Sequence, residues 1–289
     1  MKIALIGNSH IACVKLAYEN ATLDLRERLN ITFFGAPGSG LADLKLKSKT
    51  LLTNNEDLRK QLAMTSGGLE KIDLDHYDAI ILMGMYFSFS KQVIPLFANH
   101  TTKDLFRRGY TRFHLMSNEL LKLAAYDALN NTLLVSLARK IESVVPHIPL
   151  IAITEPCYPS RFLSIKTTQN KQKKAENSHA ARIQEHEISK GLCDLNLIEN
   201  IYSIFIESAS ELGKRQAFKI LFQPSETFNP TGFTKDNFNI GGVGINKVDP
   251  QRRNKDFFHM NEEYGELLIK QLLDATNPIS RSPDAATNY

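Results

Sequence analysis

The stretch MKIALIGNSH, residues 1–10, opens the chain with an apolar run that breaks at a glycine. Residues 3–6 predict a short buried strand, and residues 10–18 suit a helix. Ser9 therefore falls where a strand turns into a helix, at the edge where open α/β sheets hold ligands. The free N–H groups of a helix start can also stabilise an oxyanion. On its own the stretch favours a plain N-cap role for Asn8 or Ser9, because caps are commoner than nucleophiles.

The composition of the 289 residues, 43% hydrophobic and 23% charged, is that of an ordinary globular protein. The net charge of +4 is mildly basic, but no face of clustered Lys and Arg with interleaved aromatics occurs, which argues against nucleic acid as a partner. The three cysteines, Cys13, Cys157 and Cys193, are far apart, so we expect neither a disulfide framework nor a cysteine metal site. The pair His179 and His186 has no further ligand at a suitable spacing, and we expect no metal and no cofactor.

The start of the chain does not resemble a signal peptide, because its apolar run of residues 3–6 is too short. No stretch of the sequence is long and apolar enough to predict a membrane span. Few cysteines fit a reducing compartment. From these features we expect a cytoplasmic location.

Four further apolar runs predict buried strands, and turn residues follow them. These runs lie at residues 30–34, 77–84, 149–154 and 217–222. Helical patterns separate them, with apolar residues at spacings of three and four. The expected helical segments are 58–64, much of 91–145, 182–213 and 261–273. This alternation predicts a single α/β sandwich around a mainly parallel sheet.

We expect one domain over residues 1–276, with no internal repeat and no second boundary. The helical cover of residues 91–145 and the long loop of residues 224–255 are interpreted as pocket-shaping insertions. Residues 277–289 are rich in Pro, Ser, Asp and Asn and are expected to form a frayed tail.

A glycine-rich turn follows the second predicted strand, with the sequence GAPGSG at residues 35–40. Such a turn lets the backbone approach a ligand and direct its N–H groups at it. The spacing is not that of the dinucleotide fingerprint, and no P-loop lysine follows. An ordinary turn without a ligand is the alternative interpretation.

Asp256 and His259 lie three residues apart, just before the last predicted helix. At that spacing a turn can set the carboxylate against Nδ1 of the imidazole, which fixes the tautomer and stabilises the imidazolium. The free Nε2 can then take a proton from a serine hydroxyl. The alternative is a capping Asp with an unrelated His.

The order of these features resembles that of the SGNH (GDSL-like) hydrolase superfamily over most of the chain. The resemblance implies that Ser9 is the nucleophile and that Asp256 and His259 complete a triad. It also implies an oxyanion hole from the Ser9 N–H and a glycine N–H, here that of Gly35, with Gly38 as the alternative. The fold that it implies is a three-layer α/β/α sandwich.

The third motif departs from the family pattern, because Gly84-Met85-Tyr86 has Tyr86 where the family has an asparagine donor. A phenol can donate a hydrogen bond, but it is longer than an amide. Loss of one oxyanion donor costs about 100- to 1000-fold in turnover. Ser88 or a group from residues 224–255 is an alternative donor, and Tyr86 is otherwise a pocket-lining residue.

Two residues flank the nucleophile position. His10 can face the pocket, although a histidine at a helix start is more often structural. Cys13 lies one turn later, and burial as a small apolar side chain is its expected role.

Three functions fit this sequence. The leading hypothesis is a serine esterase-type acyl hydrolase acting on a small-molecule or carbohydrate ester, such as an O-acetyl group. The second is a carbohydrate O-acetyltransferase that uses the same triad. The third is a binding protein that has the fold but has lost catalysis, in keeping with the missing asparagine.

Overall fold

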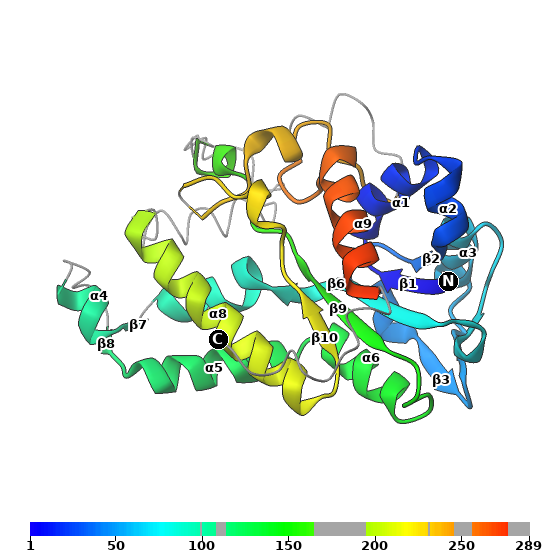
Figure 1. The fold of residues 1–289 in the computed structure, drawn as a ribbon. Helices are drawn as coiled ribbons and strands as arrows, with labels where there is room; N and C mark the ends of the chain where they lie inside the picture. Colours follow the sequence, from blue (N-terminus) through cyan, green and yellow to red (C-terminus); the bar gives the residue numbers. More distant parts are fainter. Residues whose placement is uncertain (99, 108–113, 165–194, 231, 246–255, 277–289) are drawn as a thin grey trace, which may run out of the picture.

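The structure, a computed structural model, describes residues 1–98, 100–107, 114–164, 195–230, 232–245 and 256–276. Its centre is a five-stranded parallel sheet in the order β10-β9-β6-β1-β2 (Figure 1). The strands are β1 (Lys2–Gly7), β2 (Asn30–Gly35), β6 (Ala79–Ser88), β9 (Leu150–Glu155) and β10 (Lys219–Leu221). All five predicted strands are thus present, with β6 longer and β10 shorter than expected.

Alternating side chains of the central strands enter two separate hydrophobic cores. Ile3 and Leu5 of β1 face a core shared with α1 (Ile11–Glu19) and α9 (Glu262–Thr276), and α2 (Leu23–Arg28) adjoins it. Ala4 and Ile6 face the opposite core. Its helices are α3 (Glu56–Ser66), α5 (Asn118–Asn130), α6 (Leu133–Glu142) and α8 (Leu195–Arg215). The two helical layers confirm the predicted α/β/α sandwich (Figure 1).

Polar side chains define where several helices begin. Thr22, Asn55 and Ser117 each accept a backbone N–H from the first turn of α2, α3 and α5 respectively. Asn261 does the same for α9 by accepting the Tyr264 N–H at 3.3 Å. The sequence had predicted Asn261 as this helix start, and α9 then runs three residues beyond the expected end.

The described part of residues 91–145 is largely helical, as predicted, but only part of it is α-helix. Before α5, the described chain forms a π-helical turn, η3 (Phe89–Val93), and a 3-10 helix, η4 (Ile94–Ala98). Two short paired strands, β7 (His100–Thr101) and β8 (His114–Leu115), and one short α-helix, α4 (Lys103–Arg107), follow. The apolar residues at spacings of three and four fall in α5 and α6.

The structure also contains a second, small sheet that the sequence did not predict. Its antiparallel strands are β3 (Lys45–Lys47), β4 (Thr50–Leu52) and β5 (Ile72–Asp73). Strands of two or three residues are too short to show an alternating pattern.

Buried side-chain bonds fold the first half of the predicted 224–255 loop. The Gln223 amide accepts the Cys157 N–H at 2.7 Å and donates to the hydroxyls of Thr227 and Thr234. Thr234 in turn donates to the Cys157 carbonyl at 2.6 Å. The loop is therefore fixed to the end of β9 rather than draped over the surface.

Several predicted features lie outside the described residues. They are residues 182–194 of the expected helix, residues 246–255 of the long loop, the tail at 277–289, and His179, His186 and Cys193. Among the helices that are described, none has the length and apolar content needed to cross a bilayer.

The contact between α1 and α9 predicts a strong response to one added methyl group. A Cβ on Gly265 of α9 would lie 2.1 Å from the Cys13 carbonyl oxygen of α1. We expect Gly265→Ala to lower the free energy of unfolding by about 1–3 kcal/mol, because backbone must move. This loss outweighs the gain in helix propensity of about 1 kcal/mol.

Urea denaturation measures this effect. The adjacent exposed substitution Glu266→Ala is the matched control and should change the free energy of unfolding by less than about 0.5 kcal/mol. A Gly265→Ala variant as stable as the wild type would contradict the packing described here.

Candidate active site

In the turn between β1 and α1, the Ser9 side chain makes no described hydrogen bond to the neighbouring backbone. The Asn8 side-chain oxygen accepts the His10 N–H at 3.3 Å, and the Asn8 carbonyl accepts the Ile11 N–H at 3.1 Å. Asn8 is therefore the residue whose side chain bonds the turn. Of the two capping candidates in the sequence, only Asn8 has this local role.

The Ser9 hydroxyl instead contacts a histidine 250 residues away in the chain. Nε2 of His259 lies 2.7 Å from Oγ of Ser9, and Nδ1 of His259 lies 2.5 Å from Oδ2 of Asp256. The other Asp256 oxygen accepts the backbone N–H groups of Phe258 and His259. The structure thus brings together all three residues that the sequence singled out.

The Asp256 carboxylate is held in its ionised form. Partial burial alone would raise its pKa, but the bonds from His259 and from the two backbone N–H groups lower the pKa below its usual range. An ionised Asp256 favours the His259 tautomer with its proton on Nδ1, which leaves Nε2 to accept a proton from Ser9.

Residues from two other segments brace the Asp256–His259 turn. The Asn239 amide donates to the His259 carbonyl at 2.6 Å. Arg161 donates from Nε to the Asn239 side-chain oxygen at 2.8 Å and from its guanidinium to the Asp256 carbonyl at 2.9 Å. Gly244 lies against the imidazole, where an added Cβ would be 3.5 Å from the ring. Sequence reasoning missed Arg161 and Asn239, because neither forms a motif with the triad.

Besides the Ser9 N–H, the candidate oxyanion donors are the N–H groups of two glycines, Gly35 at the end of β2 and Gly38 in the turn that follows. The Gly35 N–H donates to Oγ1 of Thr65 at 3.1 Å, and the Thr65 hydroxyl lies 2.9 Å from the Gly35 carbonyl. Gly35 is thus engaged inside the protein, which argues against it as an oxyanion donor. The N–H groups of Gly38 and Ser9 have no hydrogen-bond partner in the described parts of the chain.

The third motif forms a bulge in β6. Gly84, Met85 and Tyr86 have consecutive positive φ angles of 77°, 49° and 68°, and the register with β9 shifts between Met83 and Ser88. A Cβ on Gly84 would lie 2.3 Å from the Asn8 side-chain oxygen, so the bulge can approach the Ser9 turn only with glycine there.

The bulge turns the Tyr86 N–H toward the interior, where it donates to Oε1 of Glu155 at 2.9 Å. The Tyr86 ring is partly buried, with the Lys91 ammonium 5.3 Å from its centre. Ser88, the other predicted donor, is buried and accepts the Lys91 N–H at 3.3 Å. In this arrangement the Tyr86 N–H is engaged by Glu155, and the Ser88 side chain is buried against the Lys91 backbone.

Glu155, which the sequence analysis did not consider, lies buried behind the Ser9 turn. Its Oε1 accepts from the Asn8 amide at 3.1 Å, and its Oε2 pairs with the Lys91 ammonium at 2.6 Å. Burial alone would raise its pKa, but His10, Lys91 and the Tyr86 N–H lower the pKa to about 2. One signal was present in the sequence: Glu155 is the only charged residue of the mostly apolar run that forms β9, and it ends this strand at the Ser9 edge.

His10 is buried between this carboxylate and the candidate base. Its Nε2 lies 3.7 Å from Oε1 of Glu155, and its ring centre is 5.7 Å from that of His259. Burial lowers the pKa of His10 to about 3, so the imidazole is uncharged at neutral pH. Cys13 is buried too, as expected, and burial raises the pKa of its thiol to about 12.

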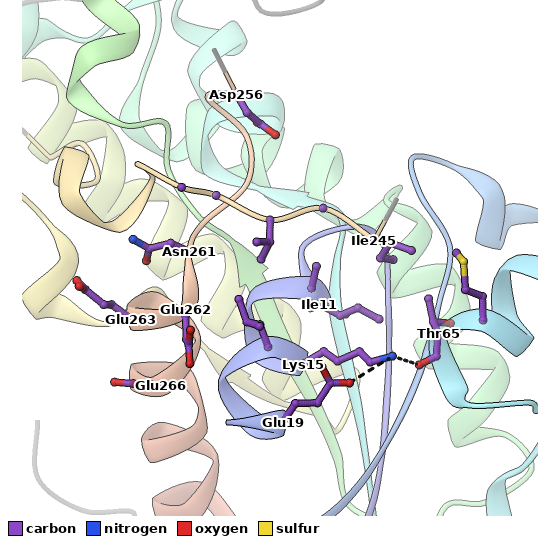
Figure 2. Close-up of a pocket in the computed structure, with 17 residues that line it drawn as sticks. Ile11, Lys15, Glu19, Thr65, Ile245, Asp256, Asn261, Glu262, Glu263 and Glu266 are labelled. Carbon is purple, nitrogen blue, oxygen red and sulfur yellow. Dashed lines mark hydrogen bonds and ion pairs between the residues drawn. The ribbon is translucent and has the colours of Figure 1, made fainter. Parts of the chain in front are cut away.

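A cavity of about 1320 Å³ adjoins the triad between α1, α9 and the chain around residue 243 (Figure 2). Asp256 and Gly244 belong to its lining, whereas Ser9 and His259 do not. Its other walls combine apolar side chains such as Ile11 and Ile245 with carboxylates at the rim. In Figure 2 the Lys15 ammonium bonds the Thr65 carbonyl at 2.7 Å and lies near Glu19. The cavity therefore lies beside the nucleophile rather than above it.

Within the part of the chain that is described, no three His, Cys, Asp or Glu side chains lie close enough together to hold a metal ion.

Comparisons with known proteins give one similar structure. No family model matches the chain, and no curated protein matches it either. Among solved structures, the chain is similar to a GDSL-like lipase from Bacteroides thetaiotaomicron, at 10% sequence identity and a TM-score of 0.35. The match covers 96% of this chain and 89% of the lipase. At this level of similarity, the proposals below rest on the chain's own residues.

Burial of His10 predicts a loss of stability in acid. The unfolded chain binds a proton at His10 below about pH 6.5, whereas the folded protein does so only near pH 3. Stability is therefore lost as the pH falls through this window, by up to about 1.4 kcal/mol per pH unit. Glu155 adds a loss of the same sign between about pH 4.5 and 2, because its folded pKa is lowered.

Urea unfolding at successive pH values tests this prediction. In His10→Gln the slope between pH 6.5 and 4.5 should largely disappear. The exposed histidine variant His76→Gln should keep the wild-type slope. An unchanged slope in His10→Gln would show that His10 is protonated in the folded protein.

Proposed function

We propose that the chain is a serine acyl hydrolase of the esterase type, with Ser9 as the nucleophile, His259 as the general base and Asp256 as its orienting carboxylate. The observation that carries this proposal is the pair of contacts through one imidazole, 2.7 Å to Ser9 and 2.5 Å to Asp256. These three residues come from opposite ends of the chain, and both nitrogens of the ring are used as acyl transfer requires.

In this reaction Oγ of Ser9 attacks the ester carbonyl while Nε2 of His259 takes the hydroxyl proton. The same proton passes to the departing alkoxide, and an acyl-enzyme remains. Asp256 keeps the imidazole in the required tautomer and stabilises its charged form. A water molecule, deprotonated by His259, then releases the acid and restores Ser9.

The tetrahedral intermediates carry a negative oxygen that needs donors. The N–H groups of Ser9 and Gly38 are proposed for this role, since both are without partners in the described chain. The Ser9 N–H precedes the first turn of α1, whose dipole also favours a negative charge there.

The proposed substrates are small-molecule or carbohydrate esters, with O-acetyl groups as the first class to examine. The adjoining cavity has room for the part of such a substrate that lies beyond the reacting ester. A carbohydrate O-acetyltransferase would use the same acyl-enzyme with a sugar hydroxyl in place of water. Product analysis with an acetylated glycan and an acceptor sugar separates the two reactions.

A binding protein without catalysis is the second candidate, and the Tyr86 bulge is the observation that favours it. Tyr86 stands where the family pattern has an asparagine side-chain donor, and the hydrogen bond described for Tyr86 runs from its backbone N–H to Glu155. A fluorophosphonate probe separates the candidates, because it labels an activated serine. Labelling of Ser9 supports the enzyme, and its absence in the folded protein supports the binding protein.

Removal of the nucleophile is the first test. Ser9→Ala should reduce hydrolysis of p-nitrophenyl acetate by about 1000-fold or more, because no other hydroxyl contacts His259 among the described residues. Fluorophosphonate labelling should vanish with it. The remote serine variant Ser143→Ala should behave as wild type in both assays. Full activity in a folded Ser9→Ala variant would refute the proposed function.

Replacement of the orienting carboxylate is the second test. Asp256→Asn should lower kcat by about 1000- to 10,000-fold with a small change in KM, because an amide no longer favours the proton on Nδ1. The control is Asp274→Asn, an exposed site at the far end of α9. A kcat within about threefold of wild type would contradict the role given to Asp256.

A further inference from the structure

We infer that Glu155 is a positioning residue of the candidate site: held by Lys91, its carboxylate fastens the Ser9 turn to the Tyr86 bulge and thereby sets Ser9 against His259. This inference rests on the proposed function, because it assigns Glu155 an effect on catalysis. Glu155 does not contact Ser9 or His259 through any described hydrogen bond, so it acts through its neighbours.

The geometry of Oε1 supports this role. It accepts the Asn8 amide at 3.1 Å and the Tyr86 N–H at 2.9 Å, so one oxygen joins two segments that follow different strands. Asn8 directly precedes Ser9, and its own side-chain oxygen holds the His10 N–H. Without Glu155 both donors would be left unpaired in a buried place, and the turn would relax to satisfy them.

Lys91 makes an ionised Glu155 possible in this place. The Glu155 side chain is 1% exposed, and a carboxylate so deeply buried needs a counter-charge. Lys91 supplies it at 2.6 Å from Oε2, and the Lys91 backbone is itself fixed by the Ser88 hydroxyl. The opposite charges of Glu155 and Lys91 thus cancel behind the Ser9 turn.

Because Lys91 balances the charge of the Glu155 carboxylate, His10 can stay uncharged beside it. The groups that face His10 are Glu155, Lys91, His259 and Asp256. Only Glu155 and Asp256 favour a proton on His10, and Asp256 already pairs with His259. Removal of Lys91 would leave Glu155 without its cation, and His10, 3.7 Å away, is the group that can replace it.

The first experiment compares two replacements of Glu155. Glu155→Leu removes both acceptors, whereas Glu155→Gln keeps an oxygen for Asn8 and Tyr86. We expect kcat for p-nitrophenyl acetate to fall by about 100-fold in the Leu variant, the size expected for a misplaced nucleophile, with KM nearly unchanged. The Gln variant should recover at least about tenfold of this loss. The control is Thr154→Val, whose buried hydroxyl has no partner in the described chain and which should keep wild-type kcat.

The second experiment needs no catalysis and follows the His10 ring by NMR in the full-length chain. In the wild type the ring should stay neutral down to about pH 3. In Lys91→Met it should take up its proton at least two pH units higher, and in Lys91→Met with Glu155→Gln the uptake should return toward the wild-type value. A His10 titration that Lys91→Met does not move would overturn the inference.

The outcomes separate this inference from the proposed function. Active, labelled wild type with an inactive Ser9→Ala variant supports the hydrolase. If a folded Glu155→Leu variant then keeps kcat within about threefold of wild type, the positioning role is wrong and the hydrolase stands. If the Leu variant does not fold, the Gln variant and the His10 titration decide. If Ser9→Ala leaves activity intact, the proposed function fails, and the titration still reports on the Glu155–Lys91 pair.

Discussion

The parallel register of β2, β1 and β6 is the constraint on which the candidate site depends. Gly7 of β1 lies opposite Gly35 of β2 and Met83 of β6, so the three strands end at one level. A Cβ on Gly7 would lie 2.5 Å from both Ile11 and the Met83 carbonyl, so α1 and β6 approach each other only across a glycine. This approach delivers Ser9, the glycine turn and the β6 bulge to the same edge of the sheet.

Bringing these segments together also buries polar groups that need partners. The buried set comprises the Asn8 amide, the Tyr86 N–H and the Lys91 ammonium, and one carboxylate from the next strand, Glu155, satisfies all of them. A buried ion pair adds little to stability by itself, because desolvation offsets most of the Coulomb attraction. The pair instead fixes the positions of the Asn8 amide and the Tyr86 N–H. The expected loss of stability in acid follows because the folded protein keeps Glu155 ionised and His10 neutral.

The sequence was sufficient for features that are local or that repeat along the chain. The apolar runs predicted all five central strands, and the resemblance to the SGNH order of motifs implied the contacts that the imidazole makes with Ser9 and Asp256. Contacts that depend on strand order were out of reach. Glu155 meets Asn8 only because β6 lies between β9 and β1, and Thr65 captures the Gly35 N–H only because α3 packs beside β2. Arg161 and Asn239 likewise reach the His259 turn through loop packing that no motif encodes.

The bulge at Tyr86 contributes to this edge through its backbone and through its side chain separately. The Tyr86 backbone N–H bonds Glu155 and so helps to fix the position of the Ser9 turn. The same N–H is then not available to bond an oxyanion. One oxyanion donor is worth about 100- to 1000-fold in turnover, and a nucleophile displaced by about 1 Å costs a comparable factor. The two effects are therefore of similar size, but they come from different parts of residue 86: the backbone N–H supports the Ser9 turn, whereas tyrosine in place of asparagine changes only the side-chain donor. Within the proposed function, catalysis then depends on the N–H groups of Ser9 and Gly38, both of which start free of protein partners in the described structure.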